Sequence, residues 1–342
     1  MQPDMITSNR AVAGAVALFI AYWMIFFGRE LVQTILLLSY SVSDSSYNAL
    51  SHDSLKNSEL SYVTKQASQE IHLEQNMQVI HTKNVTQVPL IIHRMWKDHT
   101  IPKPWRDAYN ICEEAYKQKN WTTILWTDAS IRSLLVQHFE HFLQTYNSYP
   151  YDIQRVDSAR YFILYHYGGV YLDLDVGCRN NKDIAELIRA MEYMNVDSMF
   201  PITEPFGMSN DVMFASKENQ LFKRITETLP VKNRWFGLPY LTVLFSTGPM
   251  FLSLICMNYP HAKEEILALS SDLYSKTDAR FFHHLRGSTW HSVDANTFKW
   301  LIRHWLFVVM SLVIVLMLFT FSRARIQQER QWKVFKPHRL SM

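Results

Sequence analysis

Asp173 and Asp175 are separated by one residue and are the side chains of this sequence best suited to hold a metal ion. Side chains two residues apart in an extended chain point the same way, so both carboxylates can face one site. Adjacent carboxylates repel each other and are costly to bury unless a cation lies between them. Because hard oxygen ligands suit Mg²⁺ or Mn²⁺, the pair predicts a divalent-metal site that could neutralise a leaving diphosphate. The same short pattern also occurs at solvated strand ends, and that alternative stays open.

Asp157 and Arg160 form a second polar pair, one helical turn apart. The pair could contact a ligand, with the carboxylate accepting hydrogen bonds from hydroxyl groups. Alternatively, it could be an ion pair on the helix surface, which would stabilise the helix by only roughly 0.3 kcal/mol. The residue types alone leave both interpretations open.

The pattern around these residues alternates between strands and helices. The expected elements are strands at 88–93, 122–126 and 170–172 and helices at 128–138 and 153–167. Gly168 and Gly169 end the second helix, and the strand that follows runs into Asp173. This alternation predicts an α/β domain with a mostly parallel sheet, in which ligands gather at the carboxyl ends of strands.

The composition excludes several classes of protein. Hydrophobic residues make up 48% of the 342-residue chain, which excludes a disordered protein. The formal net charge of +3 is too small to indicate nucleic-acid binding. Three cysteines cannot form a disulfide framework, and their spacing leaves a pairing of Cys112 with Cys178 open.

Two long apolar segments, 11–40 and 303–322, predict membrane anchors. A cleaved signal peptide is the alternative for the first, and a buried core helix is the alternative for the second. The excess of Lys and Arg in the tail at 323–342 predicts that the C-terminus lies in the cytosol. The remaining expected segments are a cytosolic tail at 1–10, a lumenal stem at 41–87 and a catalytic domain at 88–300.

The block from Asp157 to Asp175, DSARYFILYHYGGVYLDLD, resembles the D-x-x-R-Y…Y-G-G-x-Y-x-D-x-D block of the family 32 glycosyltransferases. Further motifs resemble those of fungal inositol phosphorylceramide mannosyltransferases and occur in the same order. They begin at Ile92, Leu125, Ser209, Ser246 and Gly287. The resemblance covers about 88–296 and implies a nucleotide-sugar transferase domain of the GT-A type, which is Rossmann-like.

The resemblance also implies roles for individual residues. Catalytic roles fall on Asp157, Arg160, Asp173 and Asp175. Substrate contacts fall on Trp96, Asp157, Arg160, Asn210, Asp211, Ser288 and Trp290. The implied metal ligands are Asp173, Asp175 and His291, with His284 as the competing third ligand. Mn²⁺ is the implied cofactor, and Mg²⁺ is the alternative.

The activity that the resemblance implies is a retaining transfer of mannose from GDP-mannose to inositol phosphorylceramide. It further implies a multi-span regulatory membrane subunit and a Golgi membrane location with a lumenal catalytic domain; the endoplasmic reticulum is the alternative compartment. A lumenal mannosyltransferase acting on protein glycans and a non-catalytic scaffold are the other interpretations. Aromatic residues at 235–240 and 281–282 are expected either in the core or at lipid headgroups.

Overall fold

The computed structural model describes residues 48–51, 54, 87–179, 183–203, 207–285 and 287, with a few further positions between 304 and 325. The chain divides into two compact units, Met1–Thr289 and Trp290–Met342, and the elements described below belong to the first. The expected anchor at 11–40 lies outside the described residues, as does nearly all of the one at 303–322.

One stretch within the described residues, Pro239–Met257, is apolar and long enough to cross a membrane, but 78% of its most apolar window is buried. It consists of two short helices, α10 (Pro239–Ser246) and α11 (Pro249–Met257), which pack on each other. A buried pair of core helices meets the same criteria of length and composition, so this stretch does not establish a membrane span.

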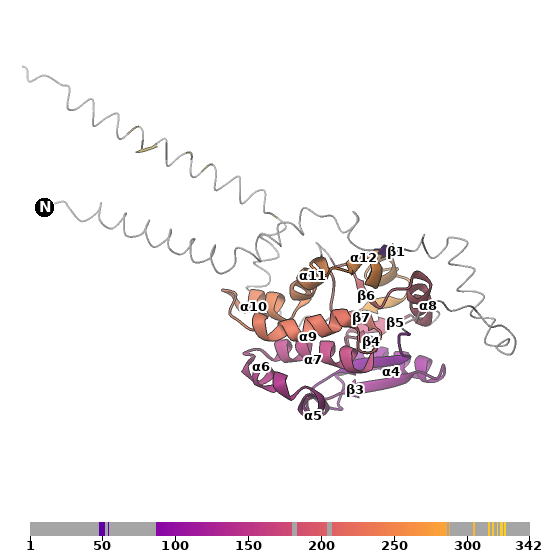
Figure 1. Cartoon of the computed structure of the whole chain (residues 1–342). Coiled ribbons are helices and arrows are strands. Elements are labelled where there is room, and N and C mark those ends of the chain that lie inside the picture. The colour runs from indigo at the N-terminus through magenta and orange to yellow at the C-terminus, as the bar shows by residue number, and fades with distance from the viewer. Residues whose placement is uncertain are drawn as a thin grey trace, which may run out of the picture. The chain divides into compact units, whose positions relative to one another are not determined.

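A seven-stranded sheet with the order β1-β8-β6-β7-β4-β2-β3 forms the centre of the first unit (Figure 1). Its strands are β1 (Asn48–Leu50), β2 (Ile91–Met95), β3 (Thr122–Trp126), β4 (Gly169–Leu172), β6 (Ser198–Pro201), β7 (Val212–Ala215) and β8 (Ile266–Leu269). Strand β7 runs antiparallel to both of its neighbours, β4 and β6, whereas the other pairs are parallel. The expectation of an α/β domain with a mostly parallel sheet is therefore confirmed.

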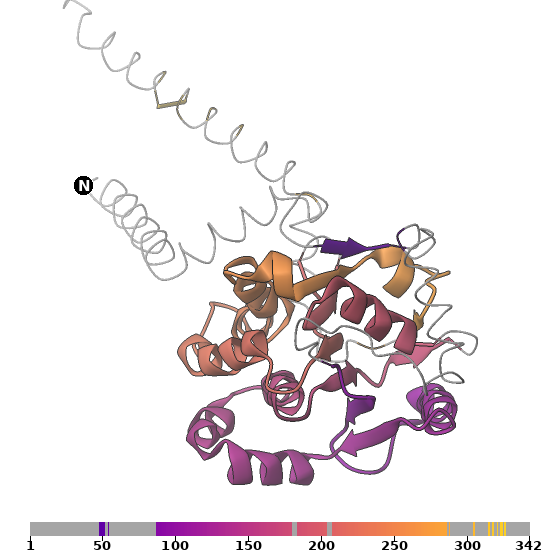
Figure 2. The same cartoon turned by 45° about the vertical axis from the view of Figure 1, so that its right-hand side comes forward.

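Helices cover both faces of this sheet (Figure 2). The helices besides α10 and α11 are α4 (Lys103–Lys117), α5 (Asp128–His138), α6 (Leu143–Ser148), α7 (Asp152–Tyr167), α8 (Ala185–Met194), α9 (Gln220–Lys232), α12 (Ala262–Glu265), α13 (Ser271–Tyr274) and the short 3₁₀ helix Glu140–Phe142. Side chains alternate along a strand, so Tyr171 packs into the apolar cluster that holds α7 and α9. Its neighbours Val170 and Leu172 pack into a second cluster, which holds α8.

The observed elements lie close to the expected ones, with two differences. The first core strand is β2 at Ile91–Met95, a few residues later than the expected 88–93. Asn48–Leu50, which the sequence analysis assigned to the stem, forms the edge strand β1 in parallel register with β8. Leu50 is buried there, so part of the expected stem belongs to the folded domain.

A disulfide joins Cys112 of α4 to Cys178 of β5 (Val176–Cys178), which resolves the pairing that the sequence left open. Strand β5 pairs antiparallel with β9 (Phe282–His284) to form a second small sheet. Because β5 begins directly after Asp175, the disulfide fixes the chain just beyond the two aspartates. The third cysteine, Cys256, is buried as a free thiol.

His93 of β2 is buried in a neutral state that its hydrogen bonds define. Its Nε2 lies 2.9 Å from the carbonyl oxygen of Gly168, and its Nδ1 accepts a hydrogen bond from the indole of Trp126 at 3.1 Å. A proton on Nδ1 would point at the indole N–H of Trp126, which is also a donor, so the ring is neutral. Burial lowers the pKa of His93 to about 4, in agreement with this state.

We predict that His93 makes the protein less stable in mild acid. Its folded pKa of about 4 lies below the ordinary value of 6.5, so the unfolded chain takes up the proton first. The stabilisation is complete above pH 6.5 and is lost as the pH falls towards 4. Between pH 7 and pH 5, His93→Gln should therefore lose roughly 2 kcal/mol less of its free energy of unfolding than the wild type. Urea unfolding at both pH values measures this, and an identical pH dependence in the two proteins would contradict it.

Candidate active site

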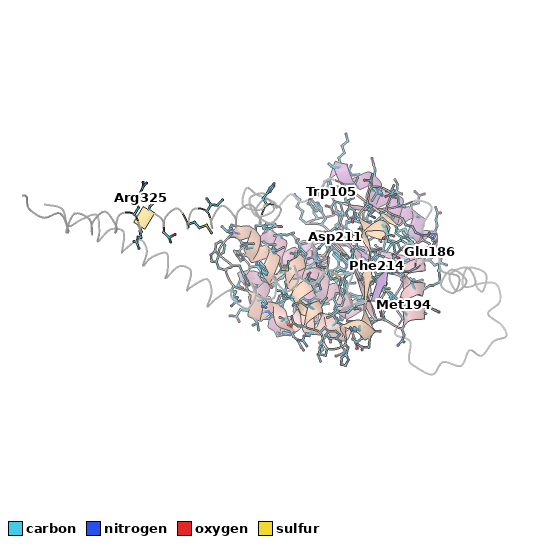
Figure 3. All side chains as sticks on the ribbon, turned by 90° about the horizontal axis from the view of Figure 1, so that it is seen from above. Trp105, Glu186, Met194, Asp211, Phe214 and Arg325 are labelled. Atoms are coloured by element: carbon cyan, nitrogen blue, oxygen red, sulfur yellow. A yellow bond between two sulfur atoms is a disulfide. The ribbon has the colours of Figure 1, made fainter. Side chains whose placement is uncertain are left out.

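The Asp173–Asp175 motif and the motif that begins at Ser209 meet at the carboxyl end of β4. Because β4 and β7 are antiparallel, the end of β4 lies beside the start of β7, with Leu172 opposite Val212. The amide of Asp173 donates a hydrogen bond to the carbonyl oxygen of Asp211 at 2.8 Å. Asp211, labelled in Figure 3, precedes β7 directly. The antiparallel strand thus brings the segment 209–211 next to Asp173.

Arg160 of α7 is the central cation of the site and is only 2% exposed. Its guanidinium lies 3.0 Å from the carboxylate of Asp157 and 3.2 Å from that of Asp173. It also donates a hydrogen bond to the carbonyl oxygen of Asn210 at 2.7 Å and stacks over the Tyr171 ring at 4.8 Å. Burial alone would lower the pKa of Arg160, but the neighbouring Asp173, Tyr171 and Asp157 raise it above its usual value. The side chain therefore remains a cation.

Asp157 is also buried, with 4% of its surface exposed. Its carboxylate accepts hydrogen bonds from the side-chain amide of Asn210 and the hydroxyl of Thr247, each at 3.2 Å. Burial raises the pKa of Asp157 to about 6, although Arg160 and these hydrogen bonds oppose the rise. The alternative of an ion pair on the helix surface is therefore wrong, because both partners lie inside the domain.

The environment of Asp173 and Asp175 matches the chemistry of a cation site. Burial raises the pKa of Asp173, and while Arg160 opposes the rise, repulsion from Asp175 and Asp211 adds to it. Burial and repulsion from Asp211 also raise the pKa of Asp175. A bound divalent cation would relieve this repulsion, so the carboxylates fit such a metal. No three His, Cys, Asp or Glu side chains within the described residues are grouped closely enough to share one ion.

Asp211 and His284 lie together on the side of Asp175. The Asp211 carboxylate accepts hydrogen bonds from the hydroxyls of Ser209 and Tyr274. His284 Nε2 lies 3.2 Å from the carbonyl oxygen of Tyr274 and must carry a proton to bond it, and Nδ1 lies 4.0 Å from Asp211. In the neutral ring this leaves the Nδ1 lone pair on the carboxylate side, an arrangement common among metal-binding histidines. The competing ligand His284 is thus near the site, whereas His291 lies outside the described residues.

The segment after β9 closes on Asp175. The amide of Leu285 donates a hydrogen bond to the carbonyl oxygen of Asp175 at 2.8 Å. Gly287 lies so close that a Cβ atom on it would clash with an Asp175 carboxylate oxygen. The next expected site residues, Ser288 and Trp290, fall outside the described residues, and their roles remain predictions.

Trp96 lies beside the turn that carries the aspartates. It packs with Trp105 and Leu174, the residue between Asp173 and Asp175, and meets the Trp105 ring edge-on at 5.4 Å. Its indole nitrogen is buried and has no hydrogen-bond partner within the described residues. The expected contact of Trp96 with a nucleotide base remains a prediction.

Sequence reasoning missed several residues that position the site. Arg94 of β2 donates hydrogen bonds to the carbonyl oxygens of Asp173 and Val176, each at 2.9 Å. It therefore holds both ends of the turn at 173–176, which we call the acidic turn. Tyr171 donates to Asp173 at 2.7 Å. An arginine inside an apolar strand was the available signal for Arg94, because a buried charge requires partners.

The comparisons with known proteins agree with this geometry. Residues 102–199 match the family described as a glycosyltransferase sugar-binding region containing a DXD motif. Since that match includes α7, β4 and both aspartates, the chain is a glycosyltransferase of the DXD class, and this class implies dependence on a divalent metal.

Curated relatives define the family more closely. The chain is 39% identical to Inositol phosphoceramide mannosyltransferase 1 of Schizosaccharomyces pombe over 64% of this chain and 67% of the relative. It is 33% identical to Mannosyl phosphorylinositol ceramide synthase SUR1 of Saccharomyces cerevisiae over 68% of this chain and 59% of the relative. The matched part thus spans about two thirds or less of these relatives. The chain belongs to the family of the inositol phosphoceramide mannosyltransferases.

Two solved structures are also similar. They are PaToxG glycosyltransferase, with 14% identity and a TM-score of 0.34 over 59% of this chain and 78% of that chain, and mouse xyloside xylosyltransferase 1, with 13% identity and a TM-score of 0.36 over 60% of this chain and 99% of that chain. Similarity of this extent supports no argument about fold or activity.

We predict that Gly287→Ala impairs the site without destabilising the fold. The added methyl group must displace the Asp175 carboxylate, which is the end of a side chain and can rotate away. Glycosyl transfer should fall by about tenfold or more, since a misplacement of about 1 Å at a reacting centre costs up to about 10²-fold in rate. The thermal unfolding midpoint should be unchanged. A variant with wild-type turnover would show that Gly287 does not constrain Asp175.

Proposed function

We propose that this protein is a retaining mannosyltransferase that transfers mannose from GDP-mannose to inositol phosphorylceramide, on a domain of the GT-A type. The observation that carries the proposal is the assembly of the buried Asp157 and Arg160 with the partly exposed Asp173 at the end of β4, next to Asp175. The names of the relatives supply the lipid acceptor and the sugar.

The residues of the site divide the work of binding a nucleotide sugar. Asp173 and Asp175 would hold Mn²⁺ or Mg²⁺, with His291 or His284 as the third ligand, and a metal bound there neutralises the charge of the diphosphate. Arg160 holds the carboxylates of Asp157 and Asp173 in place and would contact the donor sugar. Asp157 and Asn210 would orient the sugar, Asp211 would contact substrate, and Trp96 would flank the base.

The proposed location is the Golgi membrane, with the domain at 88–300 in the lumen between anchors at 11–40 and 303–322. The disulfide between Cys112 and Cys178 supports a lumenal domain, because the secretory lumen is oxidising and the cytosol is not. A multi-span membrane subunit remains part of the proposal as a partner of the anchors.

We predict that transfer depends on the two aspartates. The purified full chain, given GDP-mannose, Mn²⁺ and inositol phosphorylceramide, should form mannosylated lipid. The double substitution of Asp173→Asn and Asp175→Asn removes two charges and keeps the shape of the side chains. It should lower the rate of mannose transfer by about 10³-fold or more. Mass spectrometry of the extracted lipid measures the product.

Asp152→Asn is the matched control, because it makes the same change on the exposed first turn of α7, where the carboxylate is 93% exposed. This control should keep wild-type activity. Hydrolysis of GDP-mannose without lipid transfer would indicate that the acceptor is a protein glycan or that transfer requires the partner subunit. If neither the wild type nor the variants formed mannosylated lipid with the partner present, the result would favour a non-catalytic scaffold.

We predict that the disulfide forms in cells. Of the three cysteines in the chain, the unfolded, non-reduced protein should react with a thiol reagent at Cys256 alone. After reduction all three should react, which adds two labels detectable by mass spectrometry. Three reactive thiols before reduction would contradict both the bond and the lumenal location that it supports.

A further inference from the structure

Three large apolar side chains are exposed within one short segment, Val231–Leu238. Val231 is 76% exposed, Trp235 is 52% exposed and Leu238 is 42% exposed. Among the other described residues up to Gly287, the large exposed apolar residues are separated in sequence: Leu90, Ile111, Val136 and Tyr193. A group of exposed apolar residues that includes a tryptophan is typical of a contact surface.

The fold holds this segment in place and leaves these side chains outside. Phe236 is buried and stacks on Phe245, with ring centres 5.7 Å apart. Its amide donates a hydrogen bond to the Thr242 hydroxyl at 3.0 Å, and Gly237 allows a turn with a φ of +87°. Because Phe236 anchors the segment in the core, the exposure of Trp235 is a fixed feature of the fold.

The charged residues within the segment itself are basic, while Glu227 is exposed one turn before Val231 on α9. Lys232 and Arg234 lie within it, and the sequence has no Asp or Glu from 228 to 263. Arg234 is exposed and also covers the Phe236 ring at 5.0 Å. Tryptophan and leucine beside basic residues match the boundary of an anionic bilayer, where indole rings lie among headgroups and cations meet lipid phosphates.

The segment is also connected to the site. Helix α10 begins at Pro239, directly after Leu238, and ends at Ser246. The next residue, Thr247, donates its hydroxyl hydrogen bond to Asp157. Eight helical residues span roughly 12 Å, so one short helix joins the exposed segment to the buried acidic network.

We infer that Val231–Leu238 is a membrane-contact segment, which inserts Trp235 and Leu238 among the headgroups of an anionic bilayer with Lys232 and Arg234 against the phosphates. This contact holds the site close to a bilayer surface in addition to any terminal anchor. The inference goes beyond the proposed function and does not depend on the transfer reaction.

The test places an environment-sensitive fluorophore on Trp235→Cys in the full chain. Two of the native cysteines form a disulfide, and the third, Cys256, is buried, so the thiol reagent should label the new cysteine. The protein is reconstituted in nanodiscs of phosphatidylcholine with or without phosphatidylinositol, and quenching by headgroup-proximal spin-labelled lipid is measured. Tyr193→Cys on α8, 49% exposed in the native protein, is the matched control.

We expect the label at 235 to be quenched at least about threefold more than the label at 193, and more strongly with phosphatidylinositol. Equal quenching at the two positions would overturn the inference. A label at 235 that becomes shielded without lipid, in proportion to protein concentration, would also overturn it and would assign the surface to a second copy of the chain. Since no turnover is measured, these outcomes are independent of whether the proposed transfer occurs.

Discussion

The buried guanidinium of Arg160 is the constraint on which the site depends. A cation that is 2% exposed must be compensated inside the domain, and its partners come from three separate parts of the chain. Asp157 lies on the same helix, Asp173 follows β4, and the Asn210 carbonyl lies just before β7. Removing one partner of such a pair typically costs about 3–5 kcal/mol, so the charge that serves the chemistry also fixes these segments in place.

Negative charge still exceeds positive charge around Arg160. Asp157 and Asp173 contact the guanidinium directly, while Asp175 and Asp211 stand further along the same edge and repel Asp173. The raised pKa values of Asp173 and Asp175 show that the protein alone does not stabilise all of their charge. A site of this kind favours a divalent cation, which would offset the excess negative charge of the carboxylates.

The sequence predicted the local elements well and their burial poorly. The strand at 122–126 and the helix at 128–138 have the bounds that their patterns indicate, because propensity and capping act over a few residues. The buried Asp157 is contacted by Thr247, which is 90 residues away in the sequence. The pairing of Cys112 with Cys178 requires their Cα atoms to lie close together, and they are 5.4 Å apart. Neither distance can be derived from local pattern, and nor can the insertion of the antiparallel β7 beside β4.

The acidic turn is held in its conformation by contacts that involve no metal. Arg94 binds the carbonyl oxygens of Asp173 and Val176, Leu285 binds that of Asp175, and the disulfide fixes Cys178. The conformational entropy of this turn is therefore lost when the domain folds, and a metal ion that binds later does not have to order it. The contacts of Arg94 and Leu285 are to the backbone, so they fix the chain without occupying the carboxylates, of which that of Asp173 is already bound by Arg160 and Tyr171.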